Sequence, residues 1–217
     1  MKKLYIVGAG GFGRELHSYV LRHPDHGVEW TFTGFLDDNP DALQAFGHFA
    51  PVIPLSGHQT DAQGVYLCGF GQPATKSRLM EPLIKGNASF ITFVHPSVLI
   101  GERVRLGRGV VLCPGVILTC DILLGDFVTV NLNTTIGHDV EVGDWTVVSS
   151  QCDLTGHVKV AERVFIGSKA SVIPSRKIGS GAIVGAGSVV VRDVPPGATV
   201  FGNPAATLKG ASPTSAS

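Results

Sequence analysis

The chain has 217 residues, of which 28 are glycine, and only 16 % of its residues are charged, against an average of roughly 25 %. Hydrophobic residues make up 44 %, so intrinsic disorder is excluded, and the glycines do not recur every third residue as in collagen. Lys+Arg and Asp+Glu both number 17, and this neutral balance gives no reason to expect binding to nucleic acid or an anionic membrane.

The remaining bulk features concern compartment and metal binding. No run of 18 apolar residues exists, so no membrane span is expected. The four cysteines form no CxxC pair and no metal-finger spacing, so we expect reduced thiols, a cytoplasmic protein and no metal site. These cysteines are Cys68, Cys113, Cys120 and Cys152.

Residues 1–93 read as alternating strands and helices. A short apolar strand over 4–7 runs into a glycine loop over 8–13, and apolar residues at helical spacing then predict a helix over 14–22. Further strands are expected over 30–36, 65–68 and 90–94, and a further helix over 72–84. This order predicts a Rossmann-like α/β domain with a small parallel sheet.

The glycine loop is a candidate phosphate site. Gly8, Gly10 and Gly13 follow a strand at the spacing of a dinucleotide fingerprint, and Asp37 lies at the end of the next strand. Backbone N–H groups at the start of a helix bind phosphate, and the helix dipole adds to the attraction. On the motif alone, NAD is the leading ligand, although the domain is long enough for only one mononucleotide-binding half.

From residue 94 the hydrophobic period changes to six. Aliphatic residues occupy seventeen consecutive positions at this spacing, for which chance gives odds of roughly one in a million. They are Val94, Ile100, Leu106, Leu112, Leu118, Leu124, Val130, Ile136, Val142, Val148, Leu154, Val160, Ile166, Val172, Ile178, Val184 and Val190. Such hexads predict a parallel β-helix over 94–194 with 18 residues per coil, followed by a closing loop and flexible tail over 195–217.

These features together resemble a known family. The hexads, the segment Gly8–Glu15, the acidic pair Asp37 and Asp38, and the run 69–71 are similar to bacterial sugar-nucleotide acetyltransferases of the sialic-acid O-acetyltransferase (NeuD/PglD) type. The resemblance covers residues 1–209. It implies a left-handed β-helix, a homotrimer, acetyl-CoA as co-substrate, and transfer of acetyl to an amine or hydroxyl of a nucleotide-linked sugar.

The resemblance also assigns the chemistry. His138 matches the family's general base, and Asp139 matches the acidic neighbour that orients it. The 18-residue coil independently places Gly156 one coil above His138, at about the 4.8 Å strand spacing, where its N–H can stabilise the oxyanion of a tetrahedral intermediate. The same addition places His157 above Asp139, either as a partner of the site or as a solvent-facing corner residue.

Ligand residues are carried over in the same way. The nucleotide sugar is expected at Gly10, Gly11, Phe12, Gly13, Asp37, Asp38, Gly71 and Asn131, and acetyl-CoA at Gly156, Gly167, Ser168, Gly185, Ala186, Arg192 and Lys209. Two positions depart from relatives that have histidine there, namely Phe12 and Val147. These departures put the nucleotide and the exact acceptor in doubt, but not the reaction type.

Four functions follow, in order of preference. The first is N-acetylation of a nucleotide-linked amino sugar. The second is O-acetylation of sialic acid or a polysaccharide unit, and the third is a non-catalytic trimeric module that binds nucleotide and CoA. An NAD-dependent enzyme is the weakest, because nothing after residue 93 resembles a site for hydride transfer.

Overall fold

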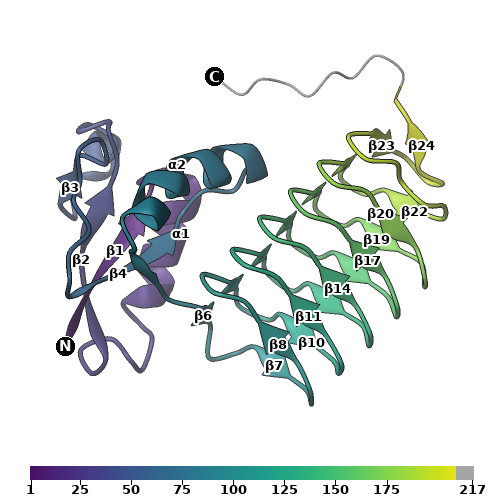
Figure 1. The fold of residues 1–217 in the computed structure, drawn as a ribbon, viewed down its shortest axis with the longest axis horizontal. Coiled ribbons are helices and arrows are strands. Elements are labelled where there is room, and N and C mark those ends of the chain that lie inside the picture. The colour runs from purple at the N-terminus through teal and green to yellow at the C-terminus, as the bar shows by residue number, and fades with distance from the viewer. Residues whose placement is uncertain (209–217) are drawn as a thin grey trace. The chain divides into compact units, whose positions relative to one another are not determined.

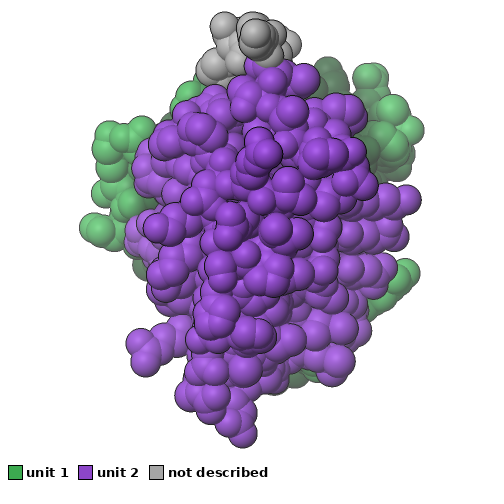
Figure 2. Space-filling model, turned by 90° about the vertical axis from the view of Figure 1, so that its right-hand side faces the viewer, with its two compact units in different colours: residues 1–71, 75–92 green, residues 72–74, 93–217 purple. Residues whose placement is uncertain are grey.

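The computed structural model describes residues 1–208, and the expected flexible tail from Ala211 lies outside them. The chain divides into two compact units, which Figure 2 shows in different colours. The first comprises residues 1–71 and 75–92, and the second comprises 72–74 and the chain from residue 93 onward. Among residues 1–208, none of the helices is long and apolar enough to cross a membrane.

The first unit is built on a parallel sheet (Figure 1). Its order is β3-β2-β1-β4-β5, with bounds β1 Lys2–Val7, β2 Trp30–Leu36, β3 Val52–Ile53, β4 Gly64–Cys68 and β5 Ser89–Phe90. The helices are α1 (Gly11–Val20) and α2 (Pro73–Lys85), with a short 3-10 helix η1 (Gln44–Phe46). The central strands β1 and β4 are mostly buried, as a parallel sheet requires. The Rossmann-like α/β fold is confirmed.

One predicted strand of this region is wrong. The segment 90–94 forms two strands in two different sheets. Phe90 pairs with Tyr66 in the first unit, whereas Phe93 of β6 pairs with Val111 of the second. The chain passes from one unit to the other between these residues, and a run in which every residue favours a strand gives no sign of that passage.

The second unit is a left-handed parallel β-helix with three faces. Face 1 holds β6 Phe93–Val94, β9 Val111–Leu112, β12 Thr129–Val130, β15 Val147–Val148, β18 Phe165–Ile166, β21 Ile183–Val184, β23 Thr199–Phe201 and β24 Ala206–Thr207. Face 2 holds β7 Leu99–Ile100, β10 Ile117–Leu118, β13 Thr135–Ile136, β16 Asp153–Leu154, β19 Ser171–Val172 and β22 Val189–Val190. Face 3 holds β8 Arg105–Leu106, β11 Leu123–Leu124, β14 Glu141–Val142, β17 Lys159–Val160 and β20 Lys177–Ile178.

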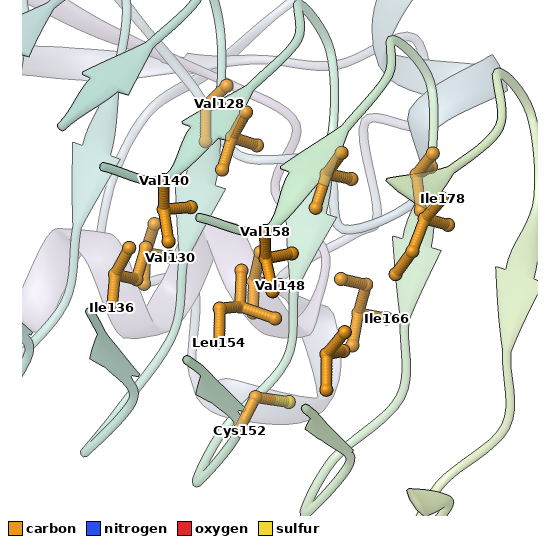
Figure 3. Packing of buried hydrophobic residues seen from close by; sticks show 14 of the residues in the cluster. Val128, Val130, Ile136, Val140, Val148, Cys152, Leu154, Val158, Ile166 and Ile178 are labelled. Atoms are coloured by element: carbon orange, nitrogen blue, oxygen red, sulfur yellow. The ribbon is translucent and has the colours of Figure 1, made fainter. Parts of the chain in front are cut away.

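The predicted 18-residue coil sets the register of the faces. Ile136 pairs with Leu154, and Leu154 pairs with Val172, each one coil further along. From Leu112 to Val190 the hexad aliphatics are buried inside the prism, where they form one continuous core, part of which Figure 3 shows, whereas Ile100 in the first coil is 43 % exposed. Burying each such side chain stabilises the fold by about 1.5–3 kcal/mol, and a slip of one residue would turn all of them outward. This explains why the hexad pattern continues without an insertion.

The glycines that follow several of the hexad aliphatics do not supply the turn between faces. At Gly137 an added Cβ would lie 2.9 Å from the backbone nitrogen of Gly156, and at Gly167 it would lie 2.6 Å from that of Ala186. These glycines therefore allow successive coils to approach closely. The left-handed turn residue comes two positions later and is usually not glycine, as at Asp139 (φ 59°).

Parallel pairing continues beyond the predicted end of the regular coils, but in a shorter register, since Val184 pairs with Val200 rather than with a residue 18 positions further on. The predicted end of the β-helix at residue 194 is followed by β23, which pairs in parallel with β21 and so extends face 1. Strand β24 then pairs with β23 in antiparallel fashion. Pro195 and Pro196 interrupt the hexad pattern before β23, which is why the sequence suggested an earlier end.

Candidate active site

His138 and Asp139 lie at the corner between face 2 and face 3. They follow β13 and precede β14, and the imidazole Nδ1 lies 2.8 Å from Asp139 Oδ2. Both side chains are about half exposed, at 56 % and 47 %. An imidazole that donates its Nδ1–H to a carboxylate carries its lone pair on Nε2, so this pair can accept a proton from solvent-facing substrate.

Gly156 lies directly beside the ring of His138, one coil away. A Cβ added at Gly156 would lie 2.6 Å from both Nε2 and Cε1 of His138. Any side chain at this position would therefore displace the ring. The proximity expected from the 18-residue repeat is present in the structure, and glycine is the residue that the close approach requires.

The turn residues of this corner form a ladder of polar groups. Arg103, Asp121, Asp139 and His157 have φ between 55° and 61° and occupy equivalent positions in successive coils. His157 Nδ1 lies 3.7 Å from Asp139 Oδ2, and its ring meets that of His138 edge-on, with centroids 5.0 Å apart. Two imidazoles therefore share one carboxylate oxygen.

The charged turn residues of the two preceding coils, Asp121 and Arg103, are already paired with each other. Arg103 donates two hydrogen bonds to the carboxylate of Asp121, and these bonds lower the pKa of Asp121 to about 2. A hydrogen bond to Asp121, together with partial burial, raises the pKa of the Cys120 thiol. Asp121 and Cys120 are thus engaged with each other and with Arg103, and Asp139 is the acid that faces the two histidines.

The residues expected to bind acetyl-CoA lie at two different corners of the prism. Gly156 and Arg192 occupy the corner of His138, and Arg192 stands three coils, or about 14 Å, further along. The others lie at the corner between face 1 and face 2, together with the predicted acceptor residue Asn131; they are Gly167, Ser168, Gly185 and Ala186. Lys209 lies outside the described residues.

Two of these residues have further local contacts. Asn131 accepts a hydrogen bond from the thiol of Cys113, one coil below, so one oxygen lone pair of its amide is occupied. Arg192 is exposed and lines a small depression of about 230 Å³ together with Ala206 and Thr207. The depression is bounded by the strand that closes the β-helix.

In the first unit, the glycine loop opens onto the start of α1. Gly10 is the N-cap and makes no side-chain hydrogen bond, and the first turn holds no acidic residue. A Cβ added at Gly10, Gly11 or Gly71 would have no heavy atom within 4 Å, so the backbone there is open to a ligand. Gly13 differs, since its Cβ would overlap the carbonyl oxygen of Gly8. Phe12 is half-buried on α1.

The acidic pair Asp37 and Asp38 is engaged within the protein. Asp37 Oδ2 accepts the N–H of Ala9 at 2.8 Å, and its Oδ1 accepts that of Asn39 at 3.0 Å. Asp38 accepts both the N–H and the hydroxyl of Ser56, at 2.6 and 2.7 Å, and these bonds lower its pKa. These carboxylates hold the glycine loop and the loop of Ser56 in place at the carboxyl ends of the strands.

Sequence reasoning missed Ser56, because no local spacing links it to Asp38. It also missed Phe46, whose ring centroid lies 3.8 Å from the guanidinium carbon of Arg14. Phe46 is 51 % exposed. The sequence contains this aromatic residue, but only the fold places it against Arg14, the residue that follows the glycine loop.

Comparisons with known proteins agree with this architecture. Residues 3–83 match the family model described as the PglD N-terminal domain. A UDP-N-acetylbacillosamine N-acetyltransferase from Bacillus subtilis is 30 % identical over 127 residues, which are 52 % of this chain and about half the length of that relative.

Solved structures match over nearly the whole chain. WeeI from Acinetobacter baumannii has a TM-score of 0.85 at 27 % identity, covering 96 % of this chain and all of that one. A perosamine N-acetyltransferase from Caulobacter crescentus, in complex with CoA and GDP-perosamine, has a TM-score of 0.82 at 28 % identity, covering 96 % and 97 %. Both the domain order and the fold are shared with these two structures, and residues 3–83 carry a domain of the PglD N-terminal type.

Proposed function

We propose that this protein transfers the acetyl group of acetyl-CoA to the amino group of a nucleotide-linked amino sugar, with His138 as general base. The observation that carries the proposal is the pair His138–Asp139, half exposed at a β-helix corner with Gly156 against the ring. Two relatives named as N-acetyltransferases support an amine as the acceptor. The CoA and GDP-perosamine complex of one of them supports the two substrate classes.

The residues fit direct transfer. The amine attacks the thioester carbon, a C–N bond forms, and His138 Nε2 takes the proton that the nitrogen loses. Asp139 stabilises the resulting imidazolium through Nδ1, and the backbone N–H of Gly156 donates to the oxyanion. When the tetrahedral intermediate collapses, the C–S bond breaks and the imidazolium returns its proton to the departing thiolate.

The first unit supplies the acceptor site in this proposal. The open backbone at Gly10, Gly11 and Gly71 takes the diphosphate at the start of α1, where N–H groups and the helix dipole favour anions. Since Asp37 and Asp38 already accept hydrogen bonds, they shape this site by holding its loops, and they retain lone pairs for a ribose or base.

The donor site requires a neighbouring copy of the chain. His138 and the small residues at Gly167, Ser168, Gly185 and Ala186 lie at different corners of the prism, so we propose a homotrimer in which one subunit's base faces the neighbour's pantetheine groove. The outward side chains of face 3 include Arg105, Lys159 and Lys177, while those of face 2 include Leu99 and Ile117. A cytoplasmic location completes the proposal, because none of the four cysteines in the described residues forms a disulfide.

A panel of acceptors tests the reaction. UDP-, GDP- and dTDP-linked 4-amino sugars and free sialic acid are each incubated with acetyl-CoA, thiol release is followed, and the acetylated atom is located by NMR. We expect N-acetylation of at least one nucleotide-linked amino sugar. O-acetylation of sialic acid alone would replace the acceptor class. Nucleotide binding without thiol release for any acceptor would reduce the protein to a binding module.

A further inference from the structure

Three side chains that can bind a metal meet at the corner between face 2 and face 3, where His138 lies. One ligand atom from each of His138, Asp139 and His157 lies within 4.8 Å of the others. Both imidazoles direct Nδ1 at the same carboxylate oxygen, Asp139 Oδ2, from 2.8 Å for His138 and 3.7 Å for His157. The sequence predicted no metal site, because it offered no metal-finger spacing, and this cluster forms only when successive coils stack.

Two of the three ligand separations are close to those of a tetrahedral zinc site, and the third is within 4.8 Å. Zinc bound at about 2.0–2.1 Å by nitrogen and oxygen ligands in tetrahedral geometry separates those ligands by about 3.3 Å. The two nitrogen–oxygen distances, 2.8 and 3.7 Å, lie on either side of this value, so small rotations of exposed side chains are enough. Two histidines and a carboxylate with water in the fourth position is a common zinc ligand set.

The backbone and the neighbouring charges reinforce the arrangement. Asp139 and His157 are both turn residues with left-handed φ, of 59° and 61°, and their coils are held together when His157 N–H donates to His138 O at 2.9 Å. Asp121 is engaged by Arg103. The Cys120 thiol is not among the ligand atoms that meet at this corner of the described structure.

We propose that His138, Asp139 and His157 form a binding site for Zn²⁺ that turns the enzyme off reversibly. Zinc takes Nδ1 of His138, so the single proton of the neutral ring moves to Nε2. The nitrogen that should accept the substrate's proton then carries a hydrogen and cannot act as a base. The inhibitory consequence rests on the proposed function, whereas the binding site itself does not.

Binding is measured on the chelator-treated full-length protein, by calorimetry with Zn²⁺ and by the ligand-field absorption of Co²⁺. We expect one ion per chain, and a loss of roughly tenfold or more in affinity in both His157→Asn and Asp139→Asn, since each removes one of three protein ligands. Two controls should leave the ion bound. Cys120→Ser removes the nearby thiol, and His23→Asn removes the separate histidine–carboxylate pair of His23 and Asp25, which are 3.6 Å apart. Unchanged affinity in His157→Asn, or lost affinity in Cys120→Ser, would overturn the site.

Inhibition is measured as the ratio of activity with added Zn²⁺ to activity with chelator, within each variant. The acetylated sugar is quantified by chromatography, because the free thiol of CoA itself binds zinc. This ratio should be about 0.1 or lower in the wild-type protein, because the ion blocks the base, and it should stay near one in His157→Asn. If the ion binds but the activity does not fall, the proposed inhibition by Zn²⁺ is overturned, while the transferase assignment stays intact. If no acceptor is acetylated even with chelator, the proposed function fails, while the binding titration still decides the metal site.

Discussion

At the residue scale, the proposed chemistry depends on how close His138 lies to the coil above it. Glycine is the only residue type at position 156 that leaves the His138 ring in its place, since a Cβ there would lie 2.6 Å from Nε2 and Cε1 of His138. Gly156 has no left-handed φ, so alanine is conformationally allowed at this position. The requirement for glycine is therefore steric and concerns the side chain of His138 rather than the backbone.

Gly156→Ala should lower kcat on the order of 10²-fold, because a misplaced base loses much of its contribution. The unfolding transition should shift little, since the clash is with an exposed, rotatable side chain. Gly181→Asn is the matched control. Gly181 is a corner glycine (φ 66°), and a Cβ added to it would have no heavy atom within 4 Å. The equivalent residues of the two preceding coils, Trp145 and Arg163, adopt the same left-handed φ without being glycine. Full activity in Gly156→Ala would show that the ring does not act where the structure places it.

Much of this site was readable from the sequence. The repeat length gave the neighbour of His138 by addition, because a β-helix converts sequence spacing of 18 into contact. The sequence could not show that Asp38 bonds to Ser56, because a loop–loop contact has no period. Nor could it show that His138 and His157 share one oxygen, because side-chain rotamers decide this.

At the element scale, the glycine loop combines two kinds of glycine. Gly13 packs against Gly8 and Gly69, and an added Cβ would overlap the Gly8 carbonyl oxygen. Gly11, two residues earlier in α1, has open space around it. The first is needed for the fold of the unit, and the second keeps the backbone accessible to a phosphate.

Gly13→Ala should destabilise the first unit by about 1–3 kcal/mol or more, because a backbone oxygen cannot move aside as a side chain can. Gly11→Ala should leave the unfolding free energy unchanged or raise it, since alanine favours helix over glycine, and should weaken nucleotide-sugar binding. Each unit contains one tryptophan, Trp30 and Trp145, so urea unfolding in a Trp145→Phe background reports the first unit alone. Equal stabilities of the two glycine variants would contradict this division of roles.

Element boundaries show where sequence patterns end. The hexads located the β-helix because burial of each aliphatic residue enforces one register. The strand over 90–94 was wrong, and one more parallel strand follows the predicted end of the regular coils at 194, because pairing partners decide both features. Phe90 and Phe93 pair in different sheets, and β23 joins face 1 without a hexad aliphatic pattern before it.

At the scale of the whole molecule, the base and the proposed pantetheine groove lie at different corners of one prism. His138 is at the corner of faces 2 and 3, and Ser168 is at the corner of faces 1 and 2. A symmetric trimer lets each subunit contribute one corner to each of two sites. The low charge of the chain agrees with faces that are covered by neighbours.

Mixed trimers test this sharing. His138→Asn lacks the base and Ser168→Trp fills the groove, so each variant alone should be inactive. Coexpressed with different tags and purified as mixed trimers, they should regain about a third of wild-type activity, because one of the three shared sites in every mixed trimer places an intact base beside an intact groove. No regained activity in verified mixed trimers would place both corners' functions within one subunit.

The central claim is that His138 removes the proton from the acceptor amine. The most direct measurement is kcat of His138→Asn with the best acceptor from the panel, alongside calorimetric binding of acetyl-CoA and the thermal unfolding of the same preparation. We predict a fall in kcat of about 10²–10⁴-fold, with acetyl-CoA affinity and unfolding temperature retained. A kcat within about threefold of wild type, which is roughly 0.7 kcal/mol of transition-state stabilisation, would contradict the assignment of His138 as the base.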